Sequence, residues 1–334
     1  MRYLPAGVVV WIACTACTAP PKDNLDVVRM TLTRSITNAP LVIADEEGFF
    51  RDEGIRIEQT DTPARGMQSI PLLDRGDIDV LASSLTVGFF AAAASGSQLR
   101  LVADRGHVRD VAGCEFNAIV GGKKSFRRAD PSAAEIRGKT ISVNAAGTAE
   151  LITERFIQSR GLQMRDVRQV KLSEMVEAQG IATGAVDIMH ASEPYVTRFV
   201  EEGHYLIGAA SSLAPGIHMG VVAFGSRLGV TDRGLGRRFM TAYLRGARQY
   251  ARGATERNVE IISRRMGFDR SLLEKSCWPA IRTDGALSER WLTEIQRWGV
   301  AKGYLPTVLP LSQVIDMSFA RAASARLDSL EAGN

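Results

Sequence analysis

A short pattern occurs twice in this chain and organises the sequence around it. Gly-Asp-Ile-Asp-Val at residues 76–80 returns as Gly-Ala-Val-Asp-Ile at residues 184–188. Each copy begins with a glycine of the kind that ends a helix and continues with an aspartate between branched apolar residues. Each soon reaches a serine, Ser83 in the first copy and Ser192 in the second. The repeat predicts a helix followed by a buried strand at two places.

The residues on either side of both copies predict one order of elements. Before the first copy, the alternation over residues 27–32 and 55–57 predicts two strands, with a helix between them that starts near Pro40. Before the second copy, residues 141–143 predict a strand and residues 152–157 a helix. The matching order of strand, loop, helix and strand predicts two similar α/β lobes with βαβ units.

The remaining segments predict how the two lobes are joined. Residues 116–120 and 218–224 are apolar and predict two strands, one crossing to the second lobe and one returning. The spacing of apolar residues beyond Asp232 predicts helices that pack on both lobes, mainly the first. We therefore expect lobe 1 over residues 27–113, lobe 2 over 114–228 and a helical C-terminal region over 229–334.

Composition excludes several classes of protein. Hydrophobic residues make up 45% and charged residues 23% of the 334 residues, values typical of a globular protein. The 41 Lys and Arg exceed the 37 Asp and Glu by only four, scattered along the chain, which gives little support to nucleic-acid binding. The mean hydropathy is −0.03 and no second long apolar run follows the N-terminus, which excludes a multi-span membrane protein.

The N-terminus predicts export. Arg2 is followed by an apolar stretch over residues 3–13 and then by small residues, as in a secretory signal. A small residue precedes both Cys14 and Cys17, so the stretch resembles the signal of a bacterial lipoprotein, in which the cysteine is acylated. We favour Cys17 because the polar residues 18–23 beyond it suit a tether; Cys14 and an uncleaved anchor are the alternatives. We expect a signal peptide over 1–16, a tether over 17–26, and a body lipid-anchored on the periplasmic or cell-surface side.

Two cysteines remain in the body of the chain. Cys114 and Cys277 are far apart in sequence, and neither has the Cys or His neighbours of a metal site. We expect two buried thiols that pack as small apolar residues, with a single disulfide as the alternative. No metal and no cofactor are expected.

Motifs of catalysis are absent from the sequence. It contains no Gly-x-Gly-x-x-Gly after the first strand, no phosphate-binding Gly-x-x-x-x-Gly-Lys-Ser/Thr, no His-Glu-x-x-His and no Gly-x-Ser-x-Gly. The four histidines are scattered, and none is spaced to activate a nucleophile. Nothing in the sequence requires an enzyme.

Five loops that follow predicted strands favour binding instead. They span residues 35–38, 62–66, 83–86, 144–148 and 191–195, and they are rich in Ser, Thr, Asn and Gly. In open α/β lobes such loops and helix N-termini take up ligands, although each such residue also suits a cap or turn. The candidate ligand-binding residues are Ser35, Asn38, Arg65, Gly66, Ser83, Ser84, Asn144, Gly147, Thr148, Glu193 and His218.

A series of short stretches resembles a known family. Leu-Val-Ile-Ala at 41–44, Gly-Phe-Phe at 48–50, Gly-Asp-Ile-Asp at 76–79, Arg-Gly-Lys-Thr-Ile at 137–141 and Glu-Pro-Tyr at 193–195 occur in the expected order. They are similar to stretches in the substrate-binding proteins of ABC importers of the nitrate, sulfonate and taurine group, which includes relatives of thiamine-pyrimidine synthases. The resemblance implies a type II periplasmic-binding fold, with two lobes that close by hinge motion over a ligand.

The resemblance implies a monomer that captures a small organic solute and delivers it to an ABC permease. Arg34, Arg65 and Arg105 favour an anionic group such as a sulfonate or carboxylate. Glu193 in the opposing lobe equally suits an amine-bearing ring, a helix cap or a salt bridge between lobes. The alternatives on the same fold are an enzyme of the thiamine-pyrimidine synthase type, which would need a cysteine-rich cluster, and a ligand-sensing partner of a receptor.

Overall fold

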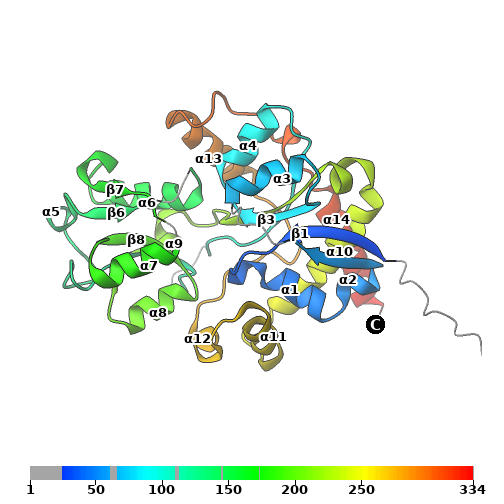
Figure 1. The fold of residues 1–334 in the computed structure, drawn as a ribbon, viewed down its shortest axis with the longest axis horizontal. Helices are drawn as coiled ribbons and strands as arrows, with labels where there is room; N and C mark the ends of the chain where they lie inside the picture. Colours follow the sequence, from blue (N-terminus) through cyan, green and yellow to red (C-terminus); the bar gives the residue numbers. More distant parts are fainter. Residues whose placement is uncertain (1–24, 61–65, 110–112, 144–145, 173, 334) are drawn as a thin grey trace, which may run out of the picture.

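Two five-stranded sheets of the same topology lie at the centres of two lobes in the computed structural model, which describes residues 25–60, 66–109, 113–143, 146–172 and 174–333 (Figure 1). The order is β2-β1-β3-β10-β4 in lobe 1 and β7-β6-β8-β5-β9 in lobe 2. In each sheet the first three strands are parallel, and the fourth runs antiparallel to both of its neighbours. The expectation of two similar α/β lobes is confirmed.

The strands are short. Lobe 1 contains β1 (Asp26–Thr31), β2 (Ile55–Gln59), β3 (Val80–Ser84), β4 (Arg100–Asp104) and β10 (Gly220–Phe224). Lobe 2 contains β5 (Asn117–Gly121), β6 (Thr140–Ser142), β7 (Arg168–Val170), β8 (Ile188–Ser192) and β9 (Tyr205–Ala209).

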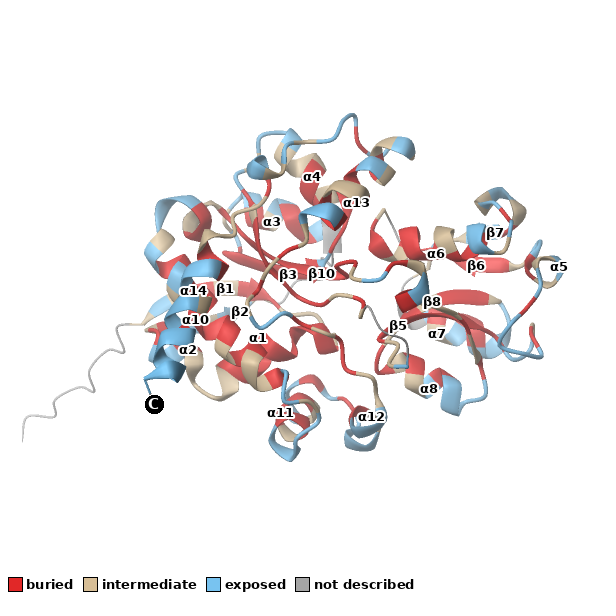
Figure 2. Ribbon diagram, turned by 180° about the vertical axis from the view of Figure 1, so that it is seen from behind, coloured by how far each residue is buried: buried red, intermediate tan, exposed pale blue. Residues whose placement is uncertain are grey.

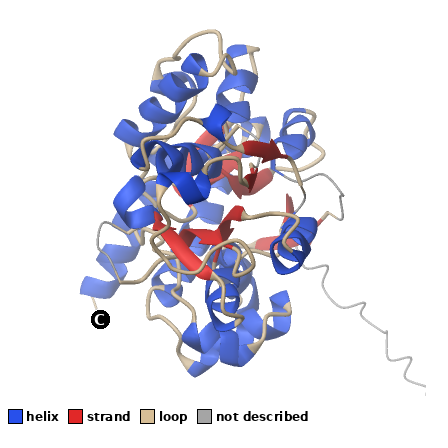
Figure 3. Ribbon diagram, turned by 90° about the vertical axis from the view of Figure 1, so that its left-hand side faces the viewer, coloured by secondary structure: helices blue, strands red, loops and turns tan. Residues whose placement is uncertain are grey.

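Helices surround the strands of both lobes (Figure 3). Those of lobe 1 are α1 (Ala39–Glu46), α2 (Phe49–Asp52), α3 (Ile70–Asp74) and α4 (Val87–Ala94), with 3₁₀ turns η1 (Ile36–Asn38) and η2 (Gly66–Ser69). Those of lobe 2 are α5 (Ala133–Ile136), α6 (Thr148–Ser159), α7 (Glu174–Thr183), α8 (Tyr195–Glu201) and α9 (Ala210–Leu213), with η3 (Met164–Asp166). The C-terminal region contains α10 (Arg233–Tyr250), α11 (Glu256–Met266), α12 (Arg270–Lys275), α13 (Glu289–Ala301) and α14 (Ser318–Ala332), with η4 (Arg227–Thr231) and η5 (Leu311–Gln313).

Pro71 lies in the first turn of α3 and does not interrupt a helix. A helix over residues 67–73 would lose a hydrogen bond at this proline. The structure instead ends the 3₁₀ turn η2 at Ser69 and starts α3 at Ile70. The N–H groups in the first turn of a helix have no acceptor within the helix, so a proline there removes no intrahelical hydrogen bond.

The fourth strand of each sheet follows a crossing between the lobes. The first crossing segment joins β4 to β5, and the return segment joins β9 to β10. The two segments pair with each other: the backbone N–H of Met219 donates to the carbonyl of Gly106 at 2.7 Å, and that of Val108 donates to the carbonyl of Ile217 at 2.9 Å. Because β10 already belongs to the first sheet, the return crossing lies before Gly220, earlier than the boundary expected at residue 228.

The C-terminal helices contact both lobes. Helices α10 and α11 pack on α1 of lobe 1, and α12 contacts α8 of lobe 2. Helix α13 contacts α4 of lobe 1 and α6 of lobe 2, on the side of the molecule opposite α12 (Figure 1). No helix in the described part of the chain is long and apolar enough to cross a membrane.

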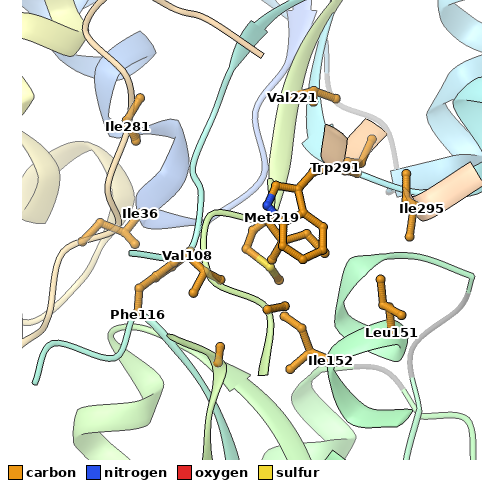
Figure 4. Close-up of a cluster of buried hydrophobic side chains, with 14 of the residues drawn as sticks. Ile36, Val108, Phe116, Leu151, Ile152, Met219, Val221, Ile281, Trp291 and Ile295 are labelled. Carbon is orange, nitrogen blue, oxygen red and sulfur yellow. The ribbon is translucent and has the colours of Figure 1, made fainter. Parts of the chain in front are cut away.

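The apolar core continues from one lobe to the other. Buried residues follow the strands of both sheets (Figure 2). One cluster runs from Ile36 in lobe 1 past Val108 and Met219 in the crossing segments to Ile152 on α6, with Trp291 of α13 packed among them (Figure 4). The two lobes and α13 therefore share one core in this conformation.

Candidate functional site

Loops from the two lobes meet directly where β3 and β6 end. The N–H of Val87 donates to the carbonyl of Ala146 at 2.9 Å, and the N–H of Thr148 donates to the carbonyl of Leu85 at 3.2 Å. Thr86 and Gly147, the residues that precede α4 and α6, face each other in this bridge. We call residues 85–87 and 146–148 the lobe contact. It places the beginnings of two helices from opposite lobes side by side.

The predicted residues Gly147 and Thr148 belong to this lobe contact. Ser83 is buried within β3, whereas Ser84 is exposed at the end of that strand. Gly66 begins the 3₁₀ turn η2. Arg65 and Asn144 lie outside the described residues, as do Cys14 and Cys17.

The loop after β1 is held by its own side chains. Asn38 is fully buried; its Nδ2 donates to the carbonyl of Thr33 at 2.8 Å, and its Oδ1 accepts from Nε of Arg105 at 2.6 Å. The hydroxyls of Ser35 and Thr37 are 2.8 Å apart. The side chains of Asn38 and Ser35 thus fix the shape of the loop.

Asp104 organises the two crossing segments between the lobes, which together we call the hinge. Its Oδ1 accepts from the N–H of Gly106 at 3.0 Å and from Nδ1 of His218 at 2.8 Å. Its Oδ2 accepts from Nδ1 of His107 at 2.9 Å and from the N–H of Arg282 at 2.9 Å. Burial alone would raise the pKa of Asp104, but the hydrogen bonds from both histidines lower it well below its usual range. The fully buried carboxylate is therefore ionised and joins three segments of the chain.

His218 is part of this hinge. It is 1% exposed, and its Nε2 accepts from the backbone N–H of Ser288 at 2.7 Å. Because an N–H can only donate, Nε2 carries no hydrogen, and Nδ1 must donate to Asp104. Both ring nitrogens of His218 are used within the protein.

Glu193 caps the helix that follows it. Its carboxylate accepts from the N–H and the hydroxyl of Thr197 at 2.9 and 2.7 Å, and from the N–H of Cys277 at 3.0 Å. Burial raises the pKa of Glu193, and these donors offset the rise only in part. The carboxylate thus joins α8 of lobe 2 to the C-terminal segment.

Cys114 and Cys277 form a disulfide, so the expectation of two separate buried thiols is wrong. Their Cα atoms are 5.3 Å apart although 163 residues separate them in sequence. The bond links the start of lobe 2 to the C-terminal segment beside Glu193. After α12 the chain brings Cys277 next to Cys114 at the start of lobe 2. The spacing of the two cysteines in sequence does not reveal this contact.

A polar strip on the sheet of lobe 2 contains Ser192 of the predicted loop over residues 191–195 and two residues outside the predicted loops, Asn117 and His190. Asn117 on β5 pairs in register with Ser192 on β8, and Nδ2 of Asn117 donates to Oγ of Ser192 at 2.6 Å. His190 lies two residues before Ser192, on the same face of β8. Oδ1 of Asn117 and Nε2 of His190 are buried and have no hydrogen-bond partner, and the same holds for Oγ1 of Thr86 in the lobe contact.

Buried polar atoms without partners are rare in proteins, so these atoms mark a place where a ligand could bind. Burial lowers the pKa of His190 to about 4, so its imidazole is neutral near pH 7 and can donate or accept a hydrogen bond. Alternation of His190 and Ser192 in a predicted strand is the signal that could have found this strip. Among the described residues, no group of three His, Cys, Asp or Glu could hold a metal ion.

Comparisons with known proteins agree with this geometry. The sequence model of the family described as "NMT1/THI5 like" matches residues 35–253, more than half of the chain. No curated protein matches the chain. The fold is similar to the alkanesulfonate-binding protein SsuA from Xanthomonas axonopodis pv. citri bound to MOPS, with a TM-score of 0.70 and 19% identity over 87% of this chain and 98% of that one.

Two further structures show the range of proteins with this fold. The periplasmic nitrate-binding protein NrtA from Synechocystis PCC 6803 has a TM-score of 0.70 and 14% identity, over 91% of this chain and 89% of that one. The desulfurization enzyme DSZB has a TM-score of 0.64 and 14% identity, over 90% of this chain and 99% of that one. At these identities the likeness establishes the fold, and it confirms the expected two-lobed periplasmic-binding architecture.

Proposed function

Because the chain belongs to the NMT1/THI5-like family, we propose that it captures a small organic solute outside the cytoplasm and delivers it to an ABC import permease. The observation that carries this proposal is the polar strip of Asn117, His190 and Ser192. Its free polar atoms belong to two paired strands, and Asn117 is the first residue of β5 after the crossing from lobe 1. A solute held between two lobes shifts the equilibrium toward closure by the contacts it gains only there. No covalent step is required.

For the ligand we propose a sulfonate-, carboxylate- or pyrimidine-like molecule. Alkanesulfonate and nitrate are the anions named for two proteins of the same fold. The polar strip offers an amide, a hydroxyl and a neutral imidazole, which form directional hydrogen bonds with an oxyanion or a ring nitrogen. We propose that Ser84, exposed at the end of β3, and Ser35 contribute from lobe 1, with Arg65 and Asn144 as further sequence-based candidates.

An enzyme on this fold is the alternative, since DSZB shares it. In the described part of this chain both cysteines are joined in a disulfide, so that part offers no free thiol as a nucleophile. Recovery of the bound compound after incubation separates the two functions, because a binding protein returns its ligand chemically unchanged.

A ligand screen tests the proposal. The mature protein is heated with taurine, alkanesulfonates, nitrate, pyrimidines and aromatic acids, and each compound that raises the Tm is titrated by calorimetry. We expect Asn117→Ala to weaken the ligand roughly tenfold or more, as for loss of one buried hydrogen bond with its desolvated partner. Ser212→Ala, an exposed change on α9, is the matched control and should leave the affinity unchanged.

We propose lipid anchoring through Cys17 as the means by which the protein stays near its permease. A tethered protein has a high effective concentration at a neighbouring partner. Cys17→Ser should release the protein from the membrane fraction, whereas Cys14→Ser should not. The reverse result would assign the anchor to Cys14.

A further inference from the structure

A pocket lies beside the hinge, and neither Asn117, His190 nor Ser192 of the polar strip lines it. It has a volume of about 420 Å³, which suits a small molecule. Three parts of the chain form it: the first crossing segment with His107 and Arg109, the end of α10 with Tyr250, and the C-terminal segment over residues 278–284. None of the described residues in the five predicted loops lines this pocket.

Arg109 carries a positive charge into this pocket without a counter-charge. Its Nη2 donates to the carbonyl of Trp278 at 3.3 Å, and its Nε is buried with no hydrogen-bond partner. Among the described residues, no carboxylate lies within ion-pair distance of this guanidinium. A buried donor left unpaired is costly, and a half-buried cation without an anion more so. Arg109 is therefore set to receive an anion.

The other charged groups of the pocket do not neutralise Arg109. Among the described residues that line it, Asp284 is the only acidic one, and Arg282 binds both of its carboxylate oxygens at 3.1 and 3.2 Å. His107 donates from Nδ1 to the ionised Asp104, which leaves its Nε2 without a protein partner in the described structure. The described lining of the pocket thus has one surplus positive charge and one free imidazole nitrogen.

An aromatic pair forms part of the wall. The rings of Tyr250 and Trp278 are stacked, with centroids 5.2 Å apart and planes 25° from parallel. Together with Pro279 and Ile281 these two residues give the pocket an apolar wall, as in most small-molecule sites. A ligand that fits both features combines a planar ring with an oxyanion.

We propose that this pocket binds a small aromatic carboxylate, whose carboxylate pairs with the guanidinium of Arg109 and whose ring packs against Tyr250 and Trp278. A planar guanidinium matches a carboxylate with two parallel hydrogen bonds. The site joins the first crossing segment to the C-terminal segment, because the N–H of His107 donates to the carbonyl of Ala280 at 2.9 Å. Its occupant therefore touches a part of the chain next to the hinge.

Calorimetric titration with sodium benzoate tests this site. Benzoate should bind the wild-type protein, and benzamide, which has the same ring without the charge, should bind at least about tenfold more weakly. Arg109→Gln should weaken benzoate by a similar factor. Arg75→Gln is the matched control, since Arg75 is exposed and its ion-pair partner among the described residues is Asp77 alone; it should have no effect.

A second variant keeps the test informative if Arg109→Gln does not fold. Ala251 lines the pocket and is exposed, so Ala251→Trp fills the pocket without removing a buried contact. It should abolish benzoate binding while leaving the circular dichroism spectrum and the binding of a ligand that needs Asn117 unchanged. The proposal is overturned if the wild type does not bind benzoate or if binding survives Ala251→Trp. It is also overturned if binding is lost in Ser84→Trp but retained in Arg109→Gln, which would place benzoate at the site proposed around the polar strip and Ser84.

Discussion

Asp79 and Asp187 each bind the second strand of their own sheet order, β1 and β6, in the same way. Oδ2 of Asp79 accepts from the backbone N–H of Arg29 at 2.9 Å, and Oδ2 of Asp187 accepts from the backbone N–H of Thr140 at 2.7 Å. The N–H of each aspartate in turn donates to the carbonyl of the same partner, at 2.8 and 2.9 Å. The repeated pattern in the sequence is therefore a strand-to-strand connection, and its aspartates are structural.

Replacing these aspartates by asparagine should destabilise the protein unequally. Asp79 also pairs with the side chains of Arg29 and Arg227, whereas Asp187 has no arginine partner in the described structure. We expect Asp79→Asn to lower the free energy of unfolding by about 2–3 kcal/mol and Asp187→Asn by about 1–2 kcal/mol. Urea denaturation measures both. The exposed Asp77→Asn is the control and should cost less than about 0.5 kcal/mol; equal losses in all three would contradict this account.

Asp104→Asn should strongly destabilise the hinge. The carboxylate accepts from four donors, and the amide of asparagine would direct N–H donors at some of them. We expect a loss of about 3–5 kcal/mol at pH 7, measured by urea denaturation.

The pH dependence of this variant has a definite sign. The pKa of Asp104 is lowered in the folded protein, so its ionised form stabilises the fold above the ordinary carboxyl pKa near 4. That contribution is lost as the pH falls toward the lowered value. The difference between wild type and Asp104→Asn should therefore narrow below pH 4, and a constant difference would show that Asp104 acts by shape alone.

His190 should make the protein sensitive to mild acid. Its pKa is about 4 in the folded protein against 6.5 in an unfolded chain. Between these values the unfolded chain takes up a proton that the folded protein does not, so stability falls as the pH drops from 6.5 to 4, by up to about 3 kcal/mol. His190→Gln should flatten this part of the profile of Tm against pH. An unchanged profile would show that the imidazole is hydrated in solution.

Reduction of the disulfide should destabilise the protein. Cys114 and Cys277 close a loop with a sequence separation of 163 residues, and loss of such a bond typically costs about 2–5 kcal/mol. Dithiothreitol should lower the Tm of the wild type. The double variant Cys114→Ser/Cys277→Ser should have that lower Tm with or without the reductant. A wild-type Tm that does not respond to dithiothreitol would mean that the bond contributes nothing to the equilibrium.

Local patterns were sufficient to predict several of the strands but insufficient to predict the surroundings of single side chains. The alternation at residues 27–32 and the glycine that ends each repeated helix depend on neighbours in sequence, so β1, β3 and β8 follow from them. His218 is different: whether its nitrogens face a ligand or Asp104 depends on a residue 114 positions away.

The same limit applies to the site. Glu193 was open to several roles because its partner, the N–H of Cys277, lies in the C-terminal segment. Asn117 carried no signal of its own, since its free Oδ1 becomes apparent only when β5 is set beside β8. The sequence alone does not distinguish a polar residue whose partner lies far along the chain from one that is left free to bind a ligand.

The shared core of the two lobes has a thermodynamic consequence for ligand capture. Trp291 of α13 and Ile152 of α6 belong to one apolar cluster with Val108 and Met219 of the crossing segments (Figure 4). Any opening that separates α13 from α6 must hydrate part of this cluster, and hydrating apolar surface raises the heat capacity. The heat-capacity change on closure around a solute should then be more negative than the buried area of the solute alone explains. Cooling should favour the open form, because hydrophobic stabilisation weakens at low temperature.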